Sequence, residues 1–270
     1  AAVRLRYRWR ESRFSVTVSL PAGSPWFEVE VEGRWFERGG AEVGTPRLEL
    51  LLPFGGEAPV LACEIPCGSI ERREAPGREV PAARWVDLRA VDGAGLLVAN
   101  DGAQAWWRAP GGGVGATLLR ASYDPDPMPE IGDHRWRFLV RPHAAALGDA
   151  ACVQFGAGFN APLTPVGTPR HGGRLPPRLA AGLSCDGAIV TQVKPAEEGQ
   201  ALIVRLQECA GKAGDAVLRV AGELGRVAGA EVCDLLERPL AGSVVRVVGQ
   251  DLRLPIAARG LATVRVRLGG

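Results

Sequence analysis

Apolar and polar residues alternate along most of this chain, and this period of two restricts its fold more than any other feature. Residues 3–10, VRLRYRWR, are the clearest case, because every second residue is an arginine. The apolar residues between them are Val3, Leu5, Tyr7 and Trp9. Successive side chains of an extended strand point to opposite faces, so we expect one buried apolar face and one solvated arginine face. We prefer this interpretation to a nucleic-acid surface of arginines and aromatics.

The same alternation recurs in short segments that are separated by Gly, Pro and Asp. The clearest segments are 13–20, 26–38, 47–54, 135–141, 201–208, 216–224, 243–256 and 262–268. The breakers between segments include PAGSP (21–25), AVDGAG (90–95) and APGGGVG (109–115). Many short strands joined by turns are typical of all-β sandwiches. Only residues 143–155 resemble a helix, and a strand is also possible there.

A Pro/Gly-rich stretch without periodicity divides the chain into two β blocks. It reads GAGFNAPLTPVGTPRHGGRLPP and is expected to be a surface connector. The predicted division is a large β domain at 1–157, a connector at 158–177 and a small β-sandwich at 178–270.

Composition excludes some classes of partner. Hydrophobic residues make up 46% of the chain, charged residues 23%, and the net charge is +2, which is typical of a globular protein. We therefore expect neither a nucleic-acid nor a membrane partner, and no apolar run reaches the roughly 18–20 residues of a membrane-spanning helix. Because the chain opens on a strand-like pattern at Ala1 without a methionine, we expect it to be part of a longer protein.

The six cysteines form no C-x-x-C pair. If Cys63 and Cys67 share one extended strand, about 13 Å separates them, which is too far to bind one metal. We expect the cysteines to be small buried apolar residues rather than disulfides or metal ligands. Together with the lack of an N-glycosylation sequon, this favours a reducing cytoplasm.

The stretch YDPDPMPEIGDHRWRFLVRPH (123–143) combines acidic residues, prolines and two histidines. Its carboxylates are Asp124, Asp126, Glu130 and Asp133. His134 and His143 lie about 30 Å apart on an extended strand, so they do not share a metal unless the chain folds back. Calcium binding by the carboxylates is the alternative, but no calcium-loop spacing is present. We expect the prolines at 125–129 to form a connecting loop that the acidic side chains cap.

Two turn sequences invite functional interpretations. The Gly-rich segment 109–120 lacks the Gly-Lys-Ser/Thr ending of a phosphate loop and precedes a strand-like segment, which favours a hairpin turn. Asn100-Asp101-Gly102 predicts a hairpin tip. Its functional alternative is a polar loop presented to a sugar, with Trp106 and Trp107 nearby for stacking. With His171 as the only other histidine, no Ser-His-Asp or Cys-His order is readable.

Taken in order, several segments resemble the C-terminal β-region of family 38 glycoside hydrolases, the retaining α-mannosidases. The resemblance runs from about residue 12 to the C-terminus. It is carried by EIPCGSIERRE, EVPAARWVDL, GLLVANDGAQAW, ATLLRASYDPDPMPEIGDHRWRFLVRPH, VTQVKPAEEGQALIVRLQECAGK and CDLLERPL. It implies a large super-sandwich, like that of galactose mutarotases, followed by a smaller β-sandwich.

The resemblance also implies where the chemistry lies. In this family a zinc-binding N-terminal barrel carries the catalytic aspartate, so this chain should hold no zinc ligand or nucleophile and should be inactive alone. Its expected role is to brace its own barrel, with a possible homo-oligomer, and to lend loops to a mannoside site. The loop residues predicted to bind substrate are Asn100 and Asp101, with Glu71 and Arg72 as second choice.

Two alternatives remain open at this stage. One is a free-standing carbohydrate-binding β-sandwich, in which Trp106 and Trp107, or Trp26 and Trp35, stack on sugar rings. The other is a mutarotase-like sugar epimerase, which needs a histidine acid and a glutamate base in one concave sheet. The residues available for that pair are His134 with Glu28, Glu30 or Glu37.

Overall fold

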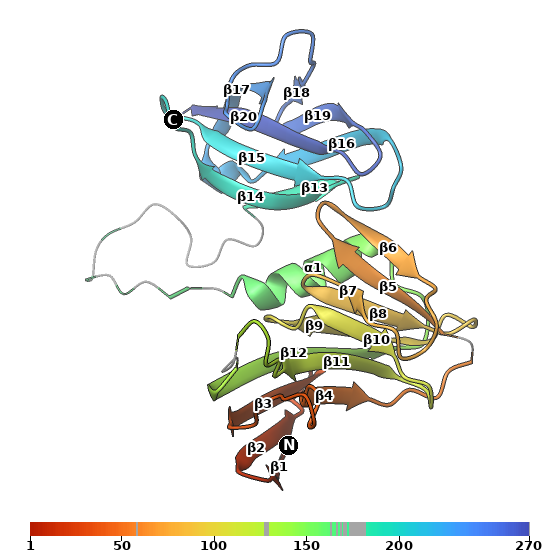
Figure 1. The fold of residues 1–270 in the computed structure, drawn as a ribbon. Helices are drawn as coiled ribbons and strands as arrows, with labels where there is room; N and C mark the ends of the chain where they lie inside the picture. Colours follow the sequence, from red (N-terminus) through yellow and green to blue (C-terminus); the bar gives the residue numbers. More distant parts are fainter. Residues whose placement is uncertain are drawn as a thin grey trace. The chain divides into compact units, whose positions relative to one another are not determined.

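The computed structural model describes residues 1–57, 59–126, 130–162, 164–165, 167, 169, 172 and 182–269. The chain divides into two compact units, unit 1 (Ala1–Pro162) and unit 2 (Leu163–Gly270) (Figure 1). Each unit is built from two antiparallel sheets, so the predicted all-β fold is confirmed. Half of the expected connector at 158–177, including His171, and residues 127–129 of the proline-rich loop lie outside the described residues.

The larger sheet of unit 1 has eight strands in the order β1-β2-β3-β12-β9-β8-β5-β6. Their bounds are β1 Ala2–Trp9, β2 Ser12–Ser19, β3 Phe27–Trp35, β12 Gly132–His143, β9 Gly95–Asn100, β8 Trp85–Arg89, β5 Val60–Ile65 and β6 Gly68–Arg72. All neighbours are antiparallel, and β12 bridges β3 and β9 because its twelve residues pair with both. Strands β1 and β6 are therefore the edges of this sheet.

A second sheet of four strands, in the order β4-β11-β10-β7, packs on one face of the first. Its strands are β4 Arg47–Leu52, β11 Val114–Arg120, β10 Ala105–Arg108 and β7 Val80–Pro81. The core between the sheets combines Val31, Val98 and Phe138 of the larger sheet with Leu52 and Trp106 of the smaller. The alternating apolar residues of both sheets meet there, as a sandwich requires.

Helix α1, Asp149–Asn160, lies along the other face of the larger sheet, beside β8 and β9 (Figure 1). A Cβ added at Gly156 would come within 2.8 Å of the Trp85 ring, so this glycine lets the helix approach the sheet closely. Strands β8 and β9 are therefore covered on both faces. The helix-or-strand ambiguity at residues 143–155 resolves into the end of β12 and this helix.

Unit 2 is a smaller sandwich of two four-stranded sheets, ordered β13-β16-β19-β18 and β14-β15-β20-β17. Its elements are β13 Leu183–Asp186, β14 Ile189–Pro195, β15 Leu202–Gln207, β16 Gly214–Val220, η1 Gly222–Leu224, β17 Arg226–Cys233, β18 Arg246–Val248, β19 Asp251–Ile256 and β20 Leu261–Gly269. Buried Val204, Leu206, Leu218, Leu252 and Val264 fill the space between the two sheets. No helix in the described ranges is long and apolar enough to cross a membrane.

Three details differ from the sequence predictions. The apolar face of β1 is exposed rather than buried, because the four-stranded sheet does not extend over it. Residues Asn100–Gly102 do not form a hairpin tip, because β9 and β10 belong to different sheets. Cys63 and Cys67 do not share a strand, because β5 ends at Ile65 and Cys67 occupies the turn before β6 with φ of 59°.

Candidate functional site

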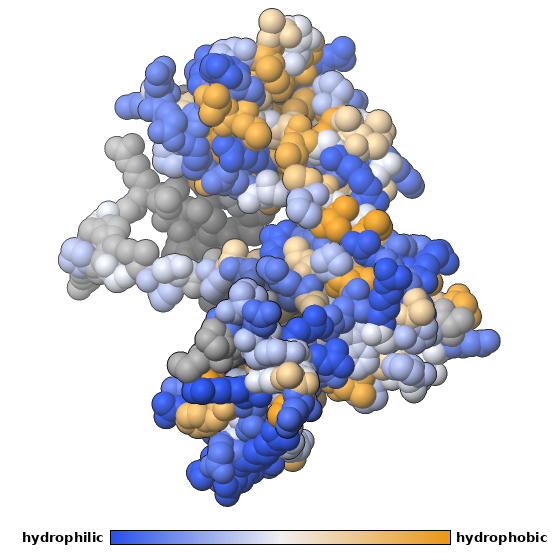
Figure 2. Space-filling model, viewed as in Figure 1, coloured by the Kyte–Doolittle hydropathy of each residue, from blue (hydrophilic) through white to orange (hydrophobic). Residues whose placement is uncertain are grey.

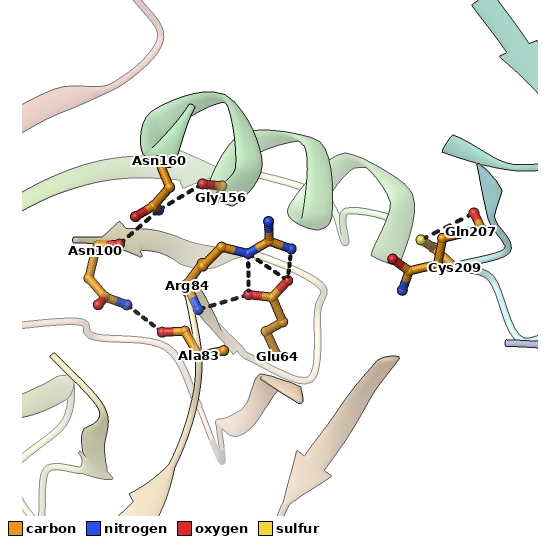
Figure 3. Close-up of polar contacts among 8 residues, drawn as sticks. All are labelled: Glu64, Ala83, Arg84, Asn100, Gly156, Asn160, Gln207 and Cys209. Atoms are coloured by element: carbon orange, nitrogen blue, oxygen red, sulfur yellow. Dashed lines mark hydrogen bonds and ion pairs between the residues drawn. The ribbon is translucent and has the colours of Figure 1, made fainter. Parts of the chain in front are cut away.

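Asn100, the first predicted substrate-binding residue, ends β9 and is 2% exposed. Its side-chain amide donates a hydrogen bond to the Ala83 carbonyl at 3.0 Å (Figure 3). Its Oδ1 accepts a hydrogen bond from the Gly102 amide at 3.0 Å. The backbone carbonyl of Asn100 accepts a bond from the Asn160 side chain of α1 at 2.9 Å. Asn100 therefore shapes the turn that leaves the sheet and ties it to the helix.

An ion pair lies beside this turn. Glu64, which is 4% exposed on β5, accepts hydrogen bonds from the Arg84 backbone amide at 2.8 Å and from its guanidinium, with Nη2 to Oε1 at 2.5 Å (Figure 3). One carboxylate thus holds both the backbone and the side chain of Arg84. Such a charge-assisted contact fixes the entry to β8 next to the exit from β9.

Asp101 has more access to solvent than Asn100, with 25% of its side chain exposed. Its Oδ1 accepts a hydrogen bond from the Arg137 backbone amide at 2.8 Å, and its Oδ2 lies 2.9 Å from Arg137 Nε. The Arg137 guanidinium lies over the Phe159 ring of α1 at 5.2 Å. We call the residues Glu64, Arg84, Asn100, Asp101, Arg137 and Asn160 the β9-end cluster. This cluster joins the end of β9 to β5, β8, β12 and α1.

Glu71 and Arg72, the second predicted pair, lie on β6 at the edge of the sheet. Three strand spacings separate β6 from β9, which corresponds to about 14 Å, so the structure does not bring the two predicted pairs together. Glu71 is half exposed and pairs with Arg73 at 2.9 Å, while Arg72 lies 3.8 Å from Glu74. Substrate binding by all four residues stays a prediction.

A third polar cluster, which sequence reasoning missed, lies on the helix-facing side of β8. Asp87 is fully buried and lies 2.8 Å from His143 Nε2 and 2.5 Å from Arg89 Nε. His143 Nδ1 lies 2.9 Å from the Ala145 carbonyl, so both ring nitrogens lie within hydrogen-bond distance of an oxygen. Although burial opposes its charge, Asp87 raises the pKa of Arg89 above the usual value. The signal in the sequence was the lone carboxylate within the apolar run WVDL.

Glycine and cysteine residues complete the packing around Asp87. A Cβ at Gly95 would come within 2.5 Å of the His143 ring, so glycine is required for the ring to lie there. Cys152 of α1 lies 4.0 Å from Asp87 Oδ2, and burial raises the pKa of its thiol to about 12. Burial likewise raises the pKa of Cys63 to about 12. Such thiols are poor nucleophiles at neutral pH, so this cluster is structural.

In unit 2, Glu208 is the best-anchored carboxylate. It is 2% exposed and accepts hydrogen bonds from the backbone amides of Ala210, Gly211, Lys212 and Arg259 at 2.5–3.1 Å. Burial opposes the charge, but these donors outweigh it and hold the pKa of Glu208 below its usual value. Next to it, the Cys209 thiol lies 3.7 Å from the Gln207 carbonyl (Figure 3).

Several of the residues proposed for the two alternative functions are buried or lie apart from one another. Trp106 and Trp35 are 0% and 1% exposed, so neither ring can stack on a sugar. His134 stacks on Trp136 and lies opposite Gly33 of β3. Glu28 and Glu30 lie five and three residues before Gly33 on that strand, so neither is opposite His134. Glu37 is buried and accepts a hydrogen bond from Ser12 at 2.9 Å. Trp26 and Trp107 remain partly exposed.

Four of the six cysteines are buried, and none of the six forms a disulfide. Cys67 is exposed because it lies in the turn before β6, outside the sheet. Cys185 on β13 is partly exposed. Within the described part of the chain, no group of three or more His, Cys, Asp or Glu side chains is arranged to hold a metal ion.

Both units are thus β-sandwiches whose buried carboxylates are paired within the chain. A sequence model described as the C-terminal domain of glycosyl hydrolases family 38 matches residues 1–128, and the C-terminal beta sandwich domain of the same family matches residues 187–266. The chain belongs to the C-terminal region of glycosyl hydrolase family 38.

The curated relatives that the chain resembles are alpha-mannosidases. The chain is 29% identical to human alpha-mannosidase 2C1 over 238 residues, which are 84% of this chain and 22% of that protein. It is 28% identical to alpha-mannosidase G of Dictyostelium discoideum over 137 residues, or 50% of this chain and 12% of that protein. The chain therefore spans about a fifth of the length of the first of these relatives.

A solved structure shows the same fold. An alpha-mannosidase from Enterococcus faecalis superposes with a TM-score of 0.74 at 18% identity, over 95% of this chain and 29% of that one. A second structure from this organism, described as a protein in glycosyl hydrolase family 38, gives a TM-score of 0.75 at 18% identity over 30% of its chain. At this identity the likeness establishes the fold alone.

Proposed function

We propose that this chain is the C-terminal β-region of an α-mannosidase, where it braces a catalytic barrel and lends a loop to the mannoside site. The observation that carries the proposal is the match of both units to C-terminal domains of family 38, in a chain that spans about a fifth of the alpha-mannosidase 2C1 relatives. Under this proposal the zinc and the nucleophile belong to the rest of the enzyme. The cytoplasmic location and the homo-oligomer stay predictions.

The internal pairing of charges supports a bracing role. Asp87, Glu64 and Glu208 are buried, and their oxygens are held by arginine, histidine or backbone donors of the chain itself. A carboxylate that serves as a general acid or a nucleophile needs access to substrate, which these three lack. They hold strands and turns in position, as a rigid support requires.

The β9-end cluster is the part that we assign to the rim of the sugar site. Asn100 is buried, and its side-chain oxygen accepts a hydrogen bond from the Gly102 amide within the turn. A quarter of the Asp101 side chain, in contrast, is exposed to solvent. We therefore assign direct contact with a sugar hydroxyl to Asp101 and positioning of the loop to Asn100. A hydrogen bond of this kind contributes about 0.5–1.5 kcal/mol net, or more when it is charge-assisted.

The test is steady-state hydrolysis of an aryl α-mannoside by the full-length enzyme and its Asp101→Ala variant. We expect KM to rise by about three- to tenfold with little change in kcat, because a contact made equally to substrate and transition state is lost. Asp92→Ala is the matched control, since Asp92 caps an exposed turn at the opposite end of β9. Unchanged kinetics for Asp101→Ala remove Asp101 from the site, and a full-length protein without α-mannosidase activity contradicts the proposal itself.

A further inference from the structure

An apolar cleft opens in unit 1 between the β1–β3 end of the larger sheet and strand β4 of the smaller sheet. Its volume is about 670 Å³. The lining residues include Tyr7, Trp9 and Val18 on one side and Leu48, Leu50 and Leu118 on the other. We call it the β1–β4 cleft. A cleft with such a lining is costly to leave in contact with water, and it marks a place where another apolar surface packs.

Strand β1 leaves its whole apolar face in solvent. Val3, Leu5, Tyr7 and Trp9 are 61%, 45%, 53% and 44% exposed. The arginines on the opposite face of β1 are exposed as well, and hydrophilic residues dominate the surface visible at this end of the unit (Figure 2). Strict alternation of this kind is typical of a strand that packs one face on a core. The sequence of β1 therefore predicts a buried apolar face, although that face is exposed.

The strand orders explain where the cover is missing. The larger sheet has eight strands and the smaller has four, and β4 is an edge strand of the smaller sheet on the side where the cleft opens. Within the described residues β4 pairs only with β11, so its other side presents unpaired backbone groups. Strands added to that edge would extend the smaller sheet over β1 and β2, because Val29 and Val31 of β3 already lie in the core.

We propose that the β1–β4 cleft is filled by β-strands of the polypeptide that precedes residue 1 in the full-length protein, added edge to edge onto β4. The matched family models describe C-terminal domains, and this chain covers 22–30% of the first relatives and solved chains, so ample polypeptide lies before the matched region in those proteins. Covering two strands at about 4.8 Å each takes about two additional strands. Their inward residues should be apolar and alternating.

Hydrogen exchange on the 1–270 chain and on the full-length protein tests this proposal. We expect the amides of β4, Arg47–Leu52, to exchange at least about tenfold more slowly in the full-length protein, because new strands pair with them. Central strand β9 is the internal control and should exchange equally in both. Equal exchange of β4 in both proteins overturns the proposal. Protection of β4 in the 1–270 chain that grows with its concentration also overturns it, because a second copy would then fill the cleft.

A matched pair of substitutions on β1 gives an independent readout. In the full-length protein, Leu5→Glu should lower Tm by at least about 4 °C, because Leu5 lies on the same face of β1 as the cleft-lining Tyr7 and Trp9, and the added strands would bury that face. Arg6→Glu on the opposite face should shift Tm by less than about 1 °C. In the 1–270 chain both should shift Tm by less than about 1 °C. If the full-length Leu5→Glu variant does not fold, the milder Leu5→Ala takes its place. Equal effects of a Leu5 variant in both proteins contradict the proposal.

The proposal rests on family membership and on the open edge of β4, and it does not rest on catalysis. Its readouts are exchange rates and melting temperatures, whereas the proposed function is tested by turnover. A full-length protein can therefore protect β4 without hydrolysing mannosides, or hydrolyse mannosides with β4 exposed.

Discussion

Strands β8 and β9 lie at the centre of the eight-stranded sheet and are covered on both faces, whereas β1 lies at its edge and is exposed along its whole length. The four-stranded sheet covers one face of β8 and β9, and α1 covers the other. Position in the sheet, rather than the apolar content of the strand, therefore decides burial. The two regions also differ in their charged residues. The centre holds buried carboxylates that are paired, and the edge strand β1 holds arginines that are exposed to solvent.

The largest expected effect compares two tryptophans of this sheet. Trp85 of β8 is fully buried, and Trp9 of β1 is 44% exposed. Trp85→Ala should destabilise unit 1 by about 3–5 kcal/mol, because it leaves a large cavity under α1. In the 1–270 chain Trp9→Ala should cost less than about 1 kcal/mol. Urea unfolding of the 1–270 chain, followed through the unit 1 transition, measures both, and equal costs would erase the distinction between centre and edge.

The charged cluster at the centre should be almost as sensitive. Asp87→Ala leaves Arg89 and His143 buried without their shared carboxylate, and should cost about 3 kcal/mol. Asp133→Ala on β12 is the matched control, since that side chain is 79% exposed and its contact with Arg34 spans 3.5 Å. We expect that control to change stability by less than about 0.5 kcal/mol. A cost for Asp87→Ala as small as that of the control would show that Asp87 does not hold the centre together.

Unit 2 shows whether a buried carboxylate that is held by backbone amides also stabilises its surroundings. Glu208→Gln should cost about 2 kcal/mol at neutral pH, because the charge-assisted bonds to four backbone amides weaken. The pKa of Glu208 is lowered in the folded state, so its stabilisation is present above the usual glutamate pKa of about 4.3 and is lost as pH falls through the lowered value. Unfolding curves between neutral and acid pH should converge for wild type and variant. A gap that persists at acid pH would contradict this assignment.

The smallest expected effect is a difference in the rates at which the cysteine thiols react with a reagent in solution, which reports how exposed each thiol is. Burial raises the pKa of Cys63 and Cys152 to about 12, so at pH 8 only about one thiol in ten thousand is ionised at each position. Cys67 is exposed in the turn before β6 and should react first with an aromatic disulfide reagent. Mass spectrometry of labelled peptides identifies the order. Early labelling of Cys152 would show that α1 leaves the centre of the sheet readily.

Much of the fold follows from local pattern. Alternation in VRLRYRWR and in the similar segments was enough to predict strands, and the glycines after Arg108 predicted the β10–β11 hairpin that the structure contains. Pattern alone did not predict pairing between distant strands. The local pattern at Asn100 therefore predicts a hairpin, although β9 and β10 lie in different sheets. It also predicts that the apolar face of β1 is buried, although that face is exposed.

The candidate site was harder to predict because its contacts join segments that are far apart in sequence. The order Asn100-Asp101-Gly102 predicted a bend, but the contacts of Asn100 with Asn160 and of Asp101 with Arg137 depend on how α1 and β12 pack. Asp87 and His143 are 56 residues apart and meet only because β8, β9 and β12 are neighbours in the sheet. A single carboxylate within an apolar strand is the local signal that could have drawn attention to Asp87.

The central claim is that this chain supports an active site without containing one. The most direct measurement is hydrolysis of an aryl α-mannoside by the purified 1–270 chain in the presence of zinc, with the full-length enzyme measured beside it. We expect turnover by the full-length enzyme and, from the 1–270 chain, no rate above that of buffer with zinc alone. Saturable hydrolysis by the 1–270 chain that scales with its concentration and is lost on unfolding would contradict the claim.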